Sequence, residues 1–215
     1  MLRNPNNLSW SVQCLLGIAI CVDLVALNAD LRLRSAAAEG ITGDSSPLHL
    51  ALLDVGVTGS LQLLAFIVTG IVFIVWFRRL RMNAEVWAGM LMTRKPGWAV
   101  GAWFIPLASL WIPREVAVDI WRASRAEPTA PDQPGELRLL NSWWTFFALS
   151  LVMSQGSGRL LGWAETPDEY SFAANLLLAT DVLDIIAAVL AILFVRRLTS
   201  MQEAKASGVT FSAVR

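Results

Sequence analysis

The chain has 215 residues, of which 55% are hydrophobic and 16% charged, whereas an average soluble domain is about 25% charged. Its 17 basic and 17 acidic residues cancel, and no basic face is large enough to follow a nucleic-acid backbone, which excludes nucleic acid as a partner. This composition favours an integral membrane protein. The ten Trp residues fit the same class, because Trp is enriched at membrane interfaces.

Four apolar runs are each long enough to cross a hydrocarbon core of about 30 Å as a helix. In chain order they cover residues 10–27, 61–77, 143–163 and 176–195. The second and fourth runs end in paired arginines. We interpret the first run as a retained span rather than a signal peptide, because it lacks a small-residue cleavage site.

A fifth apolar segment, residues 98–112, is too short to cross as a helix. Its 15 residues would rise only about 22 Å. Pro106 lies in its middle and Pro113 directly follows it, so we expect a broken or bent element.

The distribution of basic residues indicates whether this segment crosses the membrane. If it does not cross and both termini are cytoplasmic, 14 basic residues lie inside and 3 outside. If it does cross, 7 lie inside and 10 outside. The positive-inside rule therefore predicts four spans, with residues 98–112 either re-entering from the cytoplasmic side or lying along that interface.

Residues 114–125 form an amphipathic pattern on the cytoplasmic side. Val116, Ala117, Ile120 and Trp121 share one helical face, opposite a face of charged residues. Such a helix lies on a membrane surface or packs on the cytoplasmic face of the protein itself. A Pro-rich linker then leads to the third span.

The fold class that we predict is an all-α integral membrane protein with four transmembrane helices, a Pro-broken re-entrant or interfacial segment, and a cytoplasmic amphipathic helix. Residues 1–215 would form a single polytopic membrane domain that ends in a short tail, residues 199–215. The two halves of the chain read as similar hairpins, which either an internal duplication or generic membrane anchors would explain.

The most distinctive sequence is PGWAVGAWFIPLASLWIP, residues 96–113, with IWRAS at residues 120–124 and RRLRMNA at residues 78–84. These segments resemble the signature of an uncharacterised membrane family that carries the domain-of-unknown-function label 4328 and is common in actinobacteria. The resemblance extends over about residues 60–200. The family often has Asn at the central polar position, where this chain has Ser109.

The resemblance implies a multi-pass protein of a bacterial plasma membrane, and it implies neither an activity nor a cofactor. The positions of interest in this motif element are Trp98, Gly101, Trp103, Pro106, Ser109, Trp111, Pro113, Trp121 and Arg122.

Acidic residues within the apolar runs form the first candidate site. Carboxylates are costly in lipid and usually face a partner or a water-filled cavity. They would bind a cation or proton from the outer side, or they would pair with the outer arginines or reach water. The residues are Asp23, Asp181 and Asp184, and the last two share a helix face.

Basic residues at the cytoplasmic ends of the spans form the second candidate site. They would contact an anionic lipid headgroup, or they would serve only as topology anchors. These residues are Arg78, Arg79, Arg81, Arg196 and Arg197.

The Gly-rich run of residues 156–162, GSGRLLG, does not match a dinucleotide-binding loop, because its spacing is wrong and it follows an apolar span. We expect its small residues to allow close helix packing.

No catalytic, metal-binding or cofactor motif is present, and His49 is the only histidine. We therefore expect a non-enzymatic membrane module, meaning a scaffold, a lipid-interacting protein or an assembly subunit. The alternative is a small transporter or channel that uses the acids in the outer half of the spans. The expected partners are the lipid bilayer, an anionic lipid, and a second copy or another membrane protein.

Overall fold

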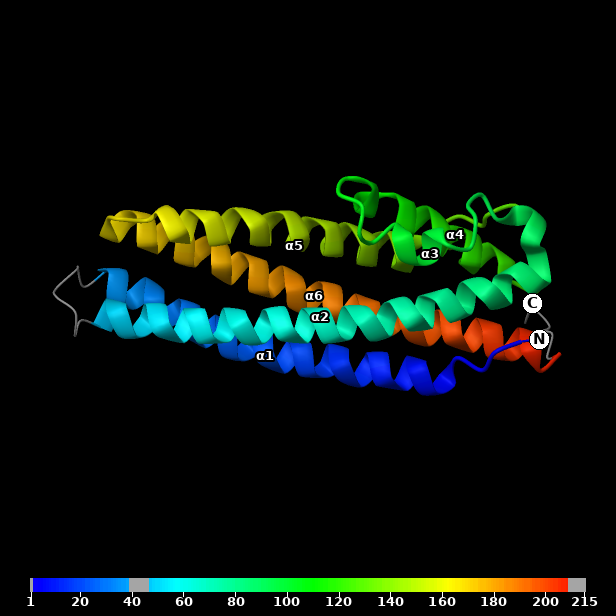
Figure 1. Ribbon diagram of the computed structural model, residues 1–215, viewed down its shortest axis with the longest axis horizontal. Helices are drawn as coiled ribbons and strands as arrows, with labels where there is room; N and C mark the ends of the chain where they lie inside the picture. Colours follow the sequence, from blue (N-terminus) through cyan, green and yellow to red (C-terminus); the bar gives the residue numbers. More distant parts are fainter. Residues whose placement is uncertain (1, 39–46, 209–215) are drawn as a thin grey trace. The chain divides into compact units, whose positions relative to one another are not determined.

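The structure is a computed structural model that describes residues 2–38 and 47–208, and all regular structure in these ranges is helical. Four long helices carry most of the chain, and shorter ones follow the second of them (Figure 1). In chain order the elements are α1 (Asn6–Ala38), α2 (Pro47–Ala88), η1 (Gly89–Leu91), α3 (Trp98–Gly101), η2 (Ala108–Leu110), α4 (Ile112–Ala123), α5 (Arg138–Trp163) and α6 (Pro167–Ala206).

The chain divides into two compact units, and each long helix contributes to both. Unit 1 comprises residues 1–14, 69–144 and 190–215, and unit 2 comprises residues 15–68 and 145–189. The two units are described separately below.

Unit 2 consists of segments of α1, α2, α5 and α6 around a core of small residues. The core includes Ala29, Ala36, Ala37, Ala51 and Ala174, together with Leu33, Leu48 and Val55. Alanine lets helix backbones approach closely, which is the usual way that helices associate in a membrane. The turn into α6 is fixed by Glu169, which accepts the backbone N–H groups of Glu165 and Thr166 at 2.8 and 3.0 Å.

Unit 1 has an aromatic core instead. The rings of Trp143 and Phe194 stack with centroids 4.6 Å apart, and Trp76 donates its indole N–H to Thr199 at 3.1 Å. Stacked and edge-to-face aromatic pairs add about 0.5–1.5 kcal/mol each beyond their buried area. The ends of α2, α5 and α6 are therefore held together by aromatic side chains.

The first and the last described segments of the chain lie together in unit 1 (Figure 1). The side-chain amide of Asn6 at the start of α1 donates to Glu203 near the end of α6 at 3.2 Å. Asn83 of α2 bonds both the backbone N–H and the backbone carbonyl of Arg3, each at 2.9 Å. The start of α1 and the end of α6 are therefore in contact within unit 1.

The segment 98–112 is broken, as its prolines predict. The helix α3 lasts only four residues, and Leu107 then has a φ of 64° and a ψ of −54°. Its neighbours close a γ-turn, because Ala108 N–H donates to the Pro106 carbonyl at 2.8 Å. Pro113, directly after the segment, does not interrupt a helix. It occupies the first turn of α4, where its fixed φ and missing N–H are favourable.

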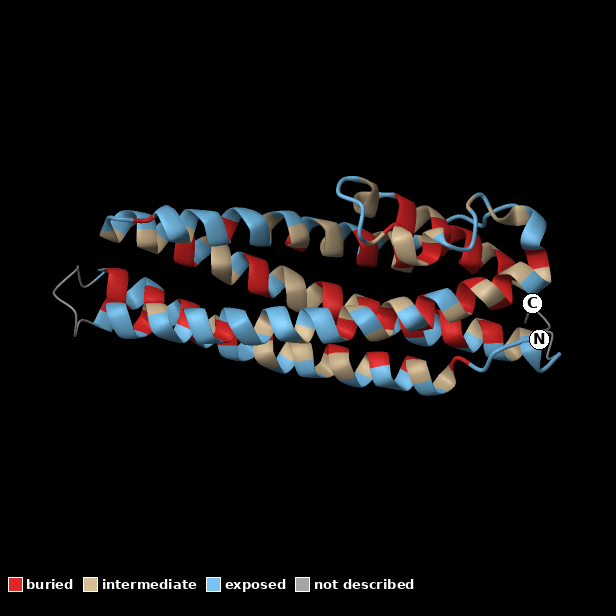
Figure 2. Ribbon diagram, in the orientation of Figure 1, coloured by how far each residue is buried: buried red, intermediate tan, exposed pale blue. Residues whose placement is uncertain are grey.

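The apolar face of α4 packs on the protein itself. Val116, Ala117, Ile120 and Trp121 are all buried within unit 1 (Figure 2). Asp119 is also buried, and it accepts hydrogen bonds from the backbone and hydroxyl of Thr93 at 2.9 and 2.7 Å. Of the two arrangements that the amphipathic pattern allowed, packing within unit 1 is the one observed.

Within residues 2–38 and 47–208, three helices are long and apolar enough to cross a membrane, namely α1, the continuous segment Pro47–Leu91, and α6. The helix α5 has 26 residues, a rise of about 39 Å, but it is less apolar because it carries several Ser, Thr, Gln and Gly residues. The glycines of α5 do not pack closely against another helix of the same chain. No atom of the described neighbours lies within 4 Å of a Cβ placed at Gly156, Gly158 or Gly162, so close packing within the chain does not explain them.

Candidate functional site

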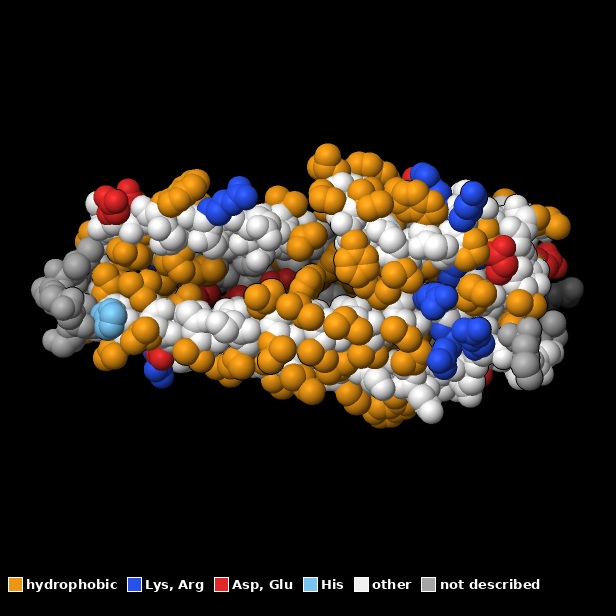
Figure 3. Space-filling model, viewed as in Figure 1, with side chains coloured by type: hydrophobic (Ala, Val, Ile, Leu, Met, Phe, Trp, Pro, Cys, Tyr) orange, Lys and Arg blue, Asp and Glu red, His pale blue; other side chains and the backbone are white. Residues whose placement is uncertain are grey.

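Four of the acidic side chains of unit 2 form a cluster that two of its helices, α1 and α6, provide. Asp23 and Asp30 of α1 and Asp181 of α6 are 7%, 3% and 4% exposed, and Asp184 of α6 is half-buried. Acidic side chains are also visible at the bottom of a hollow in one face of this unit (Figure 3). Three of these carboxyls, Asp23, Asp181 and Asp184, form the polar site predicted from the sequence.

Gln62 of α2 joins the two helices that carry the acids. Its amide nitrogen donates to Asp23 at 3.0 Å and to Asp181 at 2.9 Å. Both hydrogens of the amide are therefore used, one for each carboxyl. A single neutral side chain thus sets the distance between an acid of α1 and an acid of α6.

The two remaining acids extend the cluster along the helices. The side chain of Asp30 lies against that of Asp181, and Asp184 interacts with both Asp181 and Asp23. Ser150 of α5 lies beside Asp184. Each of the four long helices thus supplies a polar group to one connected cluster in unit 2.

The cluster has no basic counterpart in the part of the chain that the structure describes. Arg32, Arg34 and Arg159, which we considered as partners, are exposed. Arg32 pairs instead with the exposed Asp54 at 3.4 Å. Among residues 2–38 and 47–208 no three His, Cys, Asp or Glu side chains converge in a way that could hold a metal ion.

Sequence reasoning missed Asp30 and Gln62. The signal for Asp30 was its spacing, because a residue seven positions after Asp23 returns to the same helix face two turns on. We ended the first span at residue 27, which removed Asp30 from consideration. Gln62 was the only amide in its apolar run, but it carries no charge and was overlooked.

The basic residues of the second candidate site separate into two groups. Arg78, Arg196 and Arg197 are exposed. Arg79 donates to the carbonyl of Asn4 at 2.8 Å. Arg81, by contrast, is 2% exposed, pairs with Glu85 and donates to the carbonyl of Arg94. Arg81 is therefore a structural residue of unit 1, and its inclusion among the lipid contacts was wrong, because its guanidinium faces inward.

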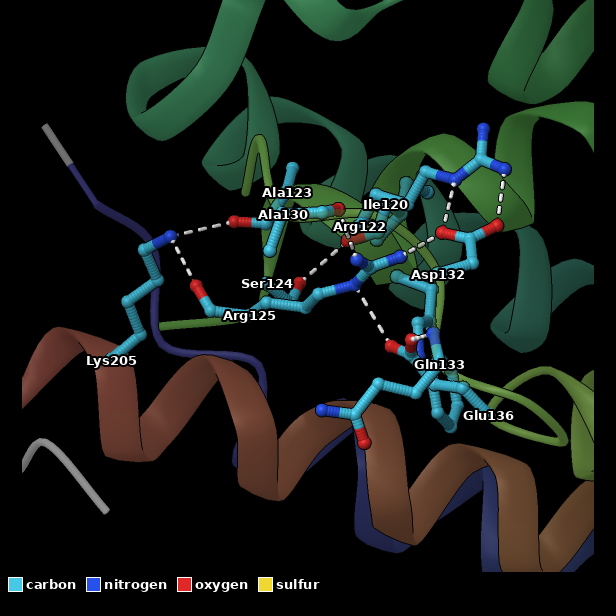
Figure 4. A network of polar contacts seen from close by, with 11 residues as sticks. Ile120, Arg122, Ala123, Ser124, Arg125, Ala130, Asp132, Gln133, Glu136 and Lys205 are labelled. Atoms are coloured by element: carbon cyan, nitrogen blue, oxygen red, sulfur yellow. Dashed lines mark hydrogen bonds and ion pairs between the residues drawn. The ribbon is translucent and has the colours of Figure 1, made fainter. Parts of the chain in front are cut away.

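A polar network surrounds the C-terminal end of α4 (Figure 4). Lys205 of α6 donates to the carbonyls of Ala123 and Arg125 at 2.8 and 2.6 Å, which satisfies carbonyls that a helix end leaves free. Burial lowers the pKa of this ammonium group. Gln202, also on α6, donates to Ser124 at 3.2 Å, so two side chains of α6 hold the end of α4.

The linker after α4 is fixed by an acid between two arginines. Asp132 accepts from Arg122 at 2.5 Å and pairs also with Arg125. The hydrogen bonds from these guanidinium groups lower the pKa of Asp132 to about 2. Glu136 pairs with Arg125 at 2.8 Å and accepts the indole N–H of Trp121 at 3.0 Å. The residues that match the end of the family motif thus order the linker.

The rest of the motif element is distributed along the broken segment. Trp103 packs edge-on against Phe73 and Phe77, with centroids 5.7 and 6.0 Å away. The ring of Trp98 lies 5.9 Å from the guanidinium carbon of Arg94. The backbone N–H of Ser109 donates to Ile105. Trp111, Pro106 and Leu107 are exposed, and Gly101 is half-buried.

The long apolar helices indicate a multi-pass membrane protein, because three of those described are long and apolar enough to cross a membrane. The chain belongs to the family described as "Domain of unknown function (DUF4328)", which matches residues 41–200. No curated protein and no solved structure matches the chain significantly.

Proposed function

We propose that this protein crosses a bacterial plasma membrane four times, through α1, α2, α5 and α6, with both termini in the cytoplasm. The 14-to-3 distribution of basic residues supports this topology. The hydrogen bond between Asn6 and Glu203 supports it independently. When both ends of a chain are on one side, the number of crossings is even, so α5 joins the three more apolar helices as a span.

We propose further that the protein is a small transporter or channel for protons or monovalent cations. The observation that carries this proposal is the amide of Gln62, which holds Asp23 and Asp181 together in a cluster without a basic partner among the described residues. Uncompensated charges inside a membrane are costly. A mobile positive charge is the simplest group that could balance them.

In the proposed topology the acids lie in the outer half of the membrane. From its cytoplasmic start, α1 reaches Asp23 before Asp30, whereas α6 runs inward and reaches Asp181 before Asp184. Asp30 would therefore be nearest the outer solution and Asp184 deepest. The carboxyls would receive a cation from outside and pass it inward.

The experiment that tests this function is ion flux in liposomes that contain the purified full chain. We expect a proton or monovalent-cation flux in the wild type and its loss in Asp181→Asn, which keeps the shape of the side chain and removes the charge. Asp54→Asn is the matched control, because Asp54 is an exposed acid that pairs with Arg32. We expect this control to retain the flux.

Equal flux in wild type, Asp181→Asn and empty liposomes would overturn the transport proposal. The protein would then be a non-enzymatic module, as the sequence first suggested. A specific observation favours a lipid-interacting module in that case. Arg78, Arg196 and Arg197 are exposed and make no ion pair in the described ranges, unlike Arg81, Arg94, Arg122 and Arg125.

We propose an anionic phospholipid as the ligand of these three arginines. Phosphatidylglycerol should raise the thermal unfolding midpoint of the purified protein more than phosphatidylcholine does. The double variant Arg196→Gln, Arg197→Gln should lose this difference, and Arg34→Gln, an exposed arginine outside the group, should keep it. An unchanged difference in the double variant would exclude this site.

We propose a second copy of the chain as the membrane protein partner, because the glycines of α5 are exposed.

A further inference from the structure

The contact between Asp30 and Asp181 requires a hydrogen atom that ionised carboxylates do not have. Asp181 uses one oxygen, Oδ1, to accept the Gln62 amide. Its other oxygen, Oδ2, is buried and receives no hydrogen bond from any N–H, hydroxyl or amide of the described residues. The side chain of Asp30, which is 3% exposed, also lies against Asp181. An ionised Asp30 is an acceptor only and cannot satisfy Asp181.

A buried acceptor without a donor is costly, and two buried carboxylates in contact are more so. One proton removes both costs, because it neutralises one carboxyl and donates to the other. A metal ion would need several converging ligands, and no such group is present in the described ranges. Two facing oxygens suffice for a proton.

We propose that Asp30 and Asp181 share one proton and form the proton-binding site of this protein. This inference rests on the proposed transport function and names the ion as H⁺. Binding forms one O–H bond on either carboxyl, and the negative charge remains on the other. The proton comes from water on the outer side, which Asp30 faces in the proposed topology.

The remaining groups of the cluster are the neighbours to which a proton could move from this pair. From α1 and α6 the pair is flanked by Asp23 and Asp184, from α2 by the neutral amide of Gln62, and from α5 by Ser150 through Asp184. Asp181 and Asp184 are three positions apart on one helix face. A proton that leaves the pair inward therefore reaches Asp184 or Asp23 without meeting a basic group among these neighbours.

Infrared difference spectroscopy of the full chain in liposomes tests the shared proton. A protonated carboxyl has a carbonyl stretching band that an ionised one lacks, and deuterium shifts it. We expect this band in the wild type at neutral pH. It should disappear in Asp30→Asn and in Asp181→Asn, because the amide N–H of the new Asn can donate to the remaining carboxylate. It should persist in Asp54→Asn.

A measurement on the unmodified protein avoids variants that do not fold. Hydrophobic carbodiimides react with protonated carboxyls in lipid, so mass spectrometry should find the label on Asp30 or Asp181 and not on Asp54. The absence of the band and of the label from the wild type would overturn the proposal. So would a band that survives both Asn variants. Either result combined with a sodium-dependent flux would identify a metal cation as the transported ion.

The two proposals fail separately. A wild type that shows the band and the label but no flux would retain the proton site and lose the transport function. A wild type that shows flux without the band or the label would retain transport and lose the shared proton.

Discussion

At the scale of single residues, charge alone did not reveal which polar side chains face inward. The sequence marked Asp23 and Asp181 because carboxylates in apolar runs are rare, and both are buried. It also grouped Arg81 with the exposed arginines, although Arg81 is 2% exposed. The difference arises because the facing partners of Arg81, Glu85 and the carbonyl of Arg94, become visible only when α2 and the loop after it are placed in space.

Gln62 illustrates the same limit for a neutral residue. Within an apolar run one amide gives little signal, since its two hydrogens can serve many partners. The structure assigns each hydrogen to a different acid. Such a bridge depends on the rotation of three helices about their axes, which neither composition nor periodicity fixes to the required accuracy.

Asp132 leads to a prediction about acid stability. Because the ion pairs with Arg122 and Arg125 lower its pKa in the folded state to about 2, an unfolded value near 3.9 lies above it. The stabilisation is present above the unfolded pKa and is lost as the pH falls through the folded one. Asp132 is exposed, so we expect Asp132→Asn to cost less than about 1 kcal/mol at neutral pH.

The thermal unfolding midpoint of the purified protein, measured against pH, checks this prediction. The wild type and Asp132→Asn should differ at neutral pH and converge between about pH 4 and pH 2. Glu127→Gln provides the control, because Glu127 is an exposed acid of the same linker without an ion pair in the described structure. A difference that stays constant over this pH range would contradict the assigned cause.

At the scale of elements, proline predicted that the segment 98–112 is broken but not how the chain turns there. Pro106 itself is exposed, and the reversal depends on the positive φ of Leu107 next to it. No sequence rule places a leucine in that conformation, because a side chain is strained there. Two contacts hold the segment instead. Its own Trp103 packs in the aromatic core, and the indole N–H of Trp144 donates to the carbonyl of Leu110 at 3.0 Å.

This turn distinguishes two substitutions at Leu107. The side chain is 70% exposed, so Leu107→Ala and Leu107→Gly remove similar contacts. Only Gly relieves the positive φ, and we expect Leu107→Gly to be more stable than Leu107→Ala by about 1 kcal/mol. In a helix the order reverses, because Gly costs about 1 kcal/mol relative to Ala. Thermal unfolding of the two variants decides; a more stable Ala variant would contradict the γ-turn.

At the scale of the whole molecule, the sequence predicted the helices better than their limits. The four apolar runs fall within α1, α2, α5 and α6, but the helices continue well beyond them, and α1 ends at Ala38 rather than near residue 27. The length of an apolar run reflects the thickness of the hydrocarbon core, whereas a helix continues as long as its residues can pack or be solvated. The extension of α1 is what brings Asp30 into the cluster.

Topology gives the last prediction. The three most apolar helices alone would place the termini on opposite sides, yet Asn6 contacts Glu203 within one compact unit. We therefore propose that the helix α5, at about 39 Å of rise, supplies the fourth crossing despite its polar residues. Reporter fusions after residue 130 and at the C-terminus should both be cytoplasmic, and a fusion near Glu165, in the turn between α5 and α6, should be external. An external signal after residue 130, or a cytoplasmic one near Glu165, would remove α5 from the spans and with it the proposed outer access to Asp30.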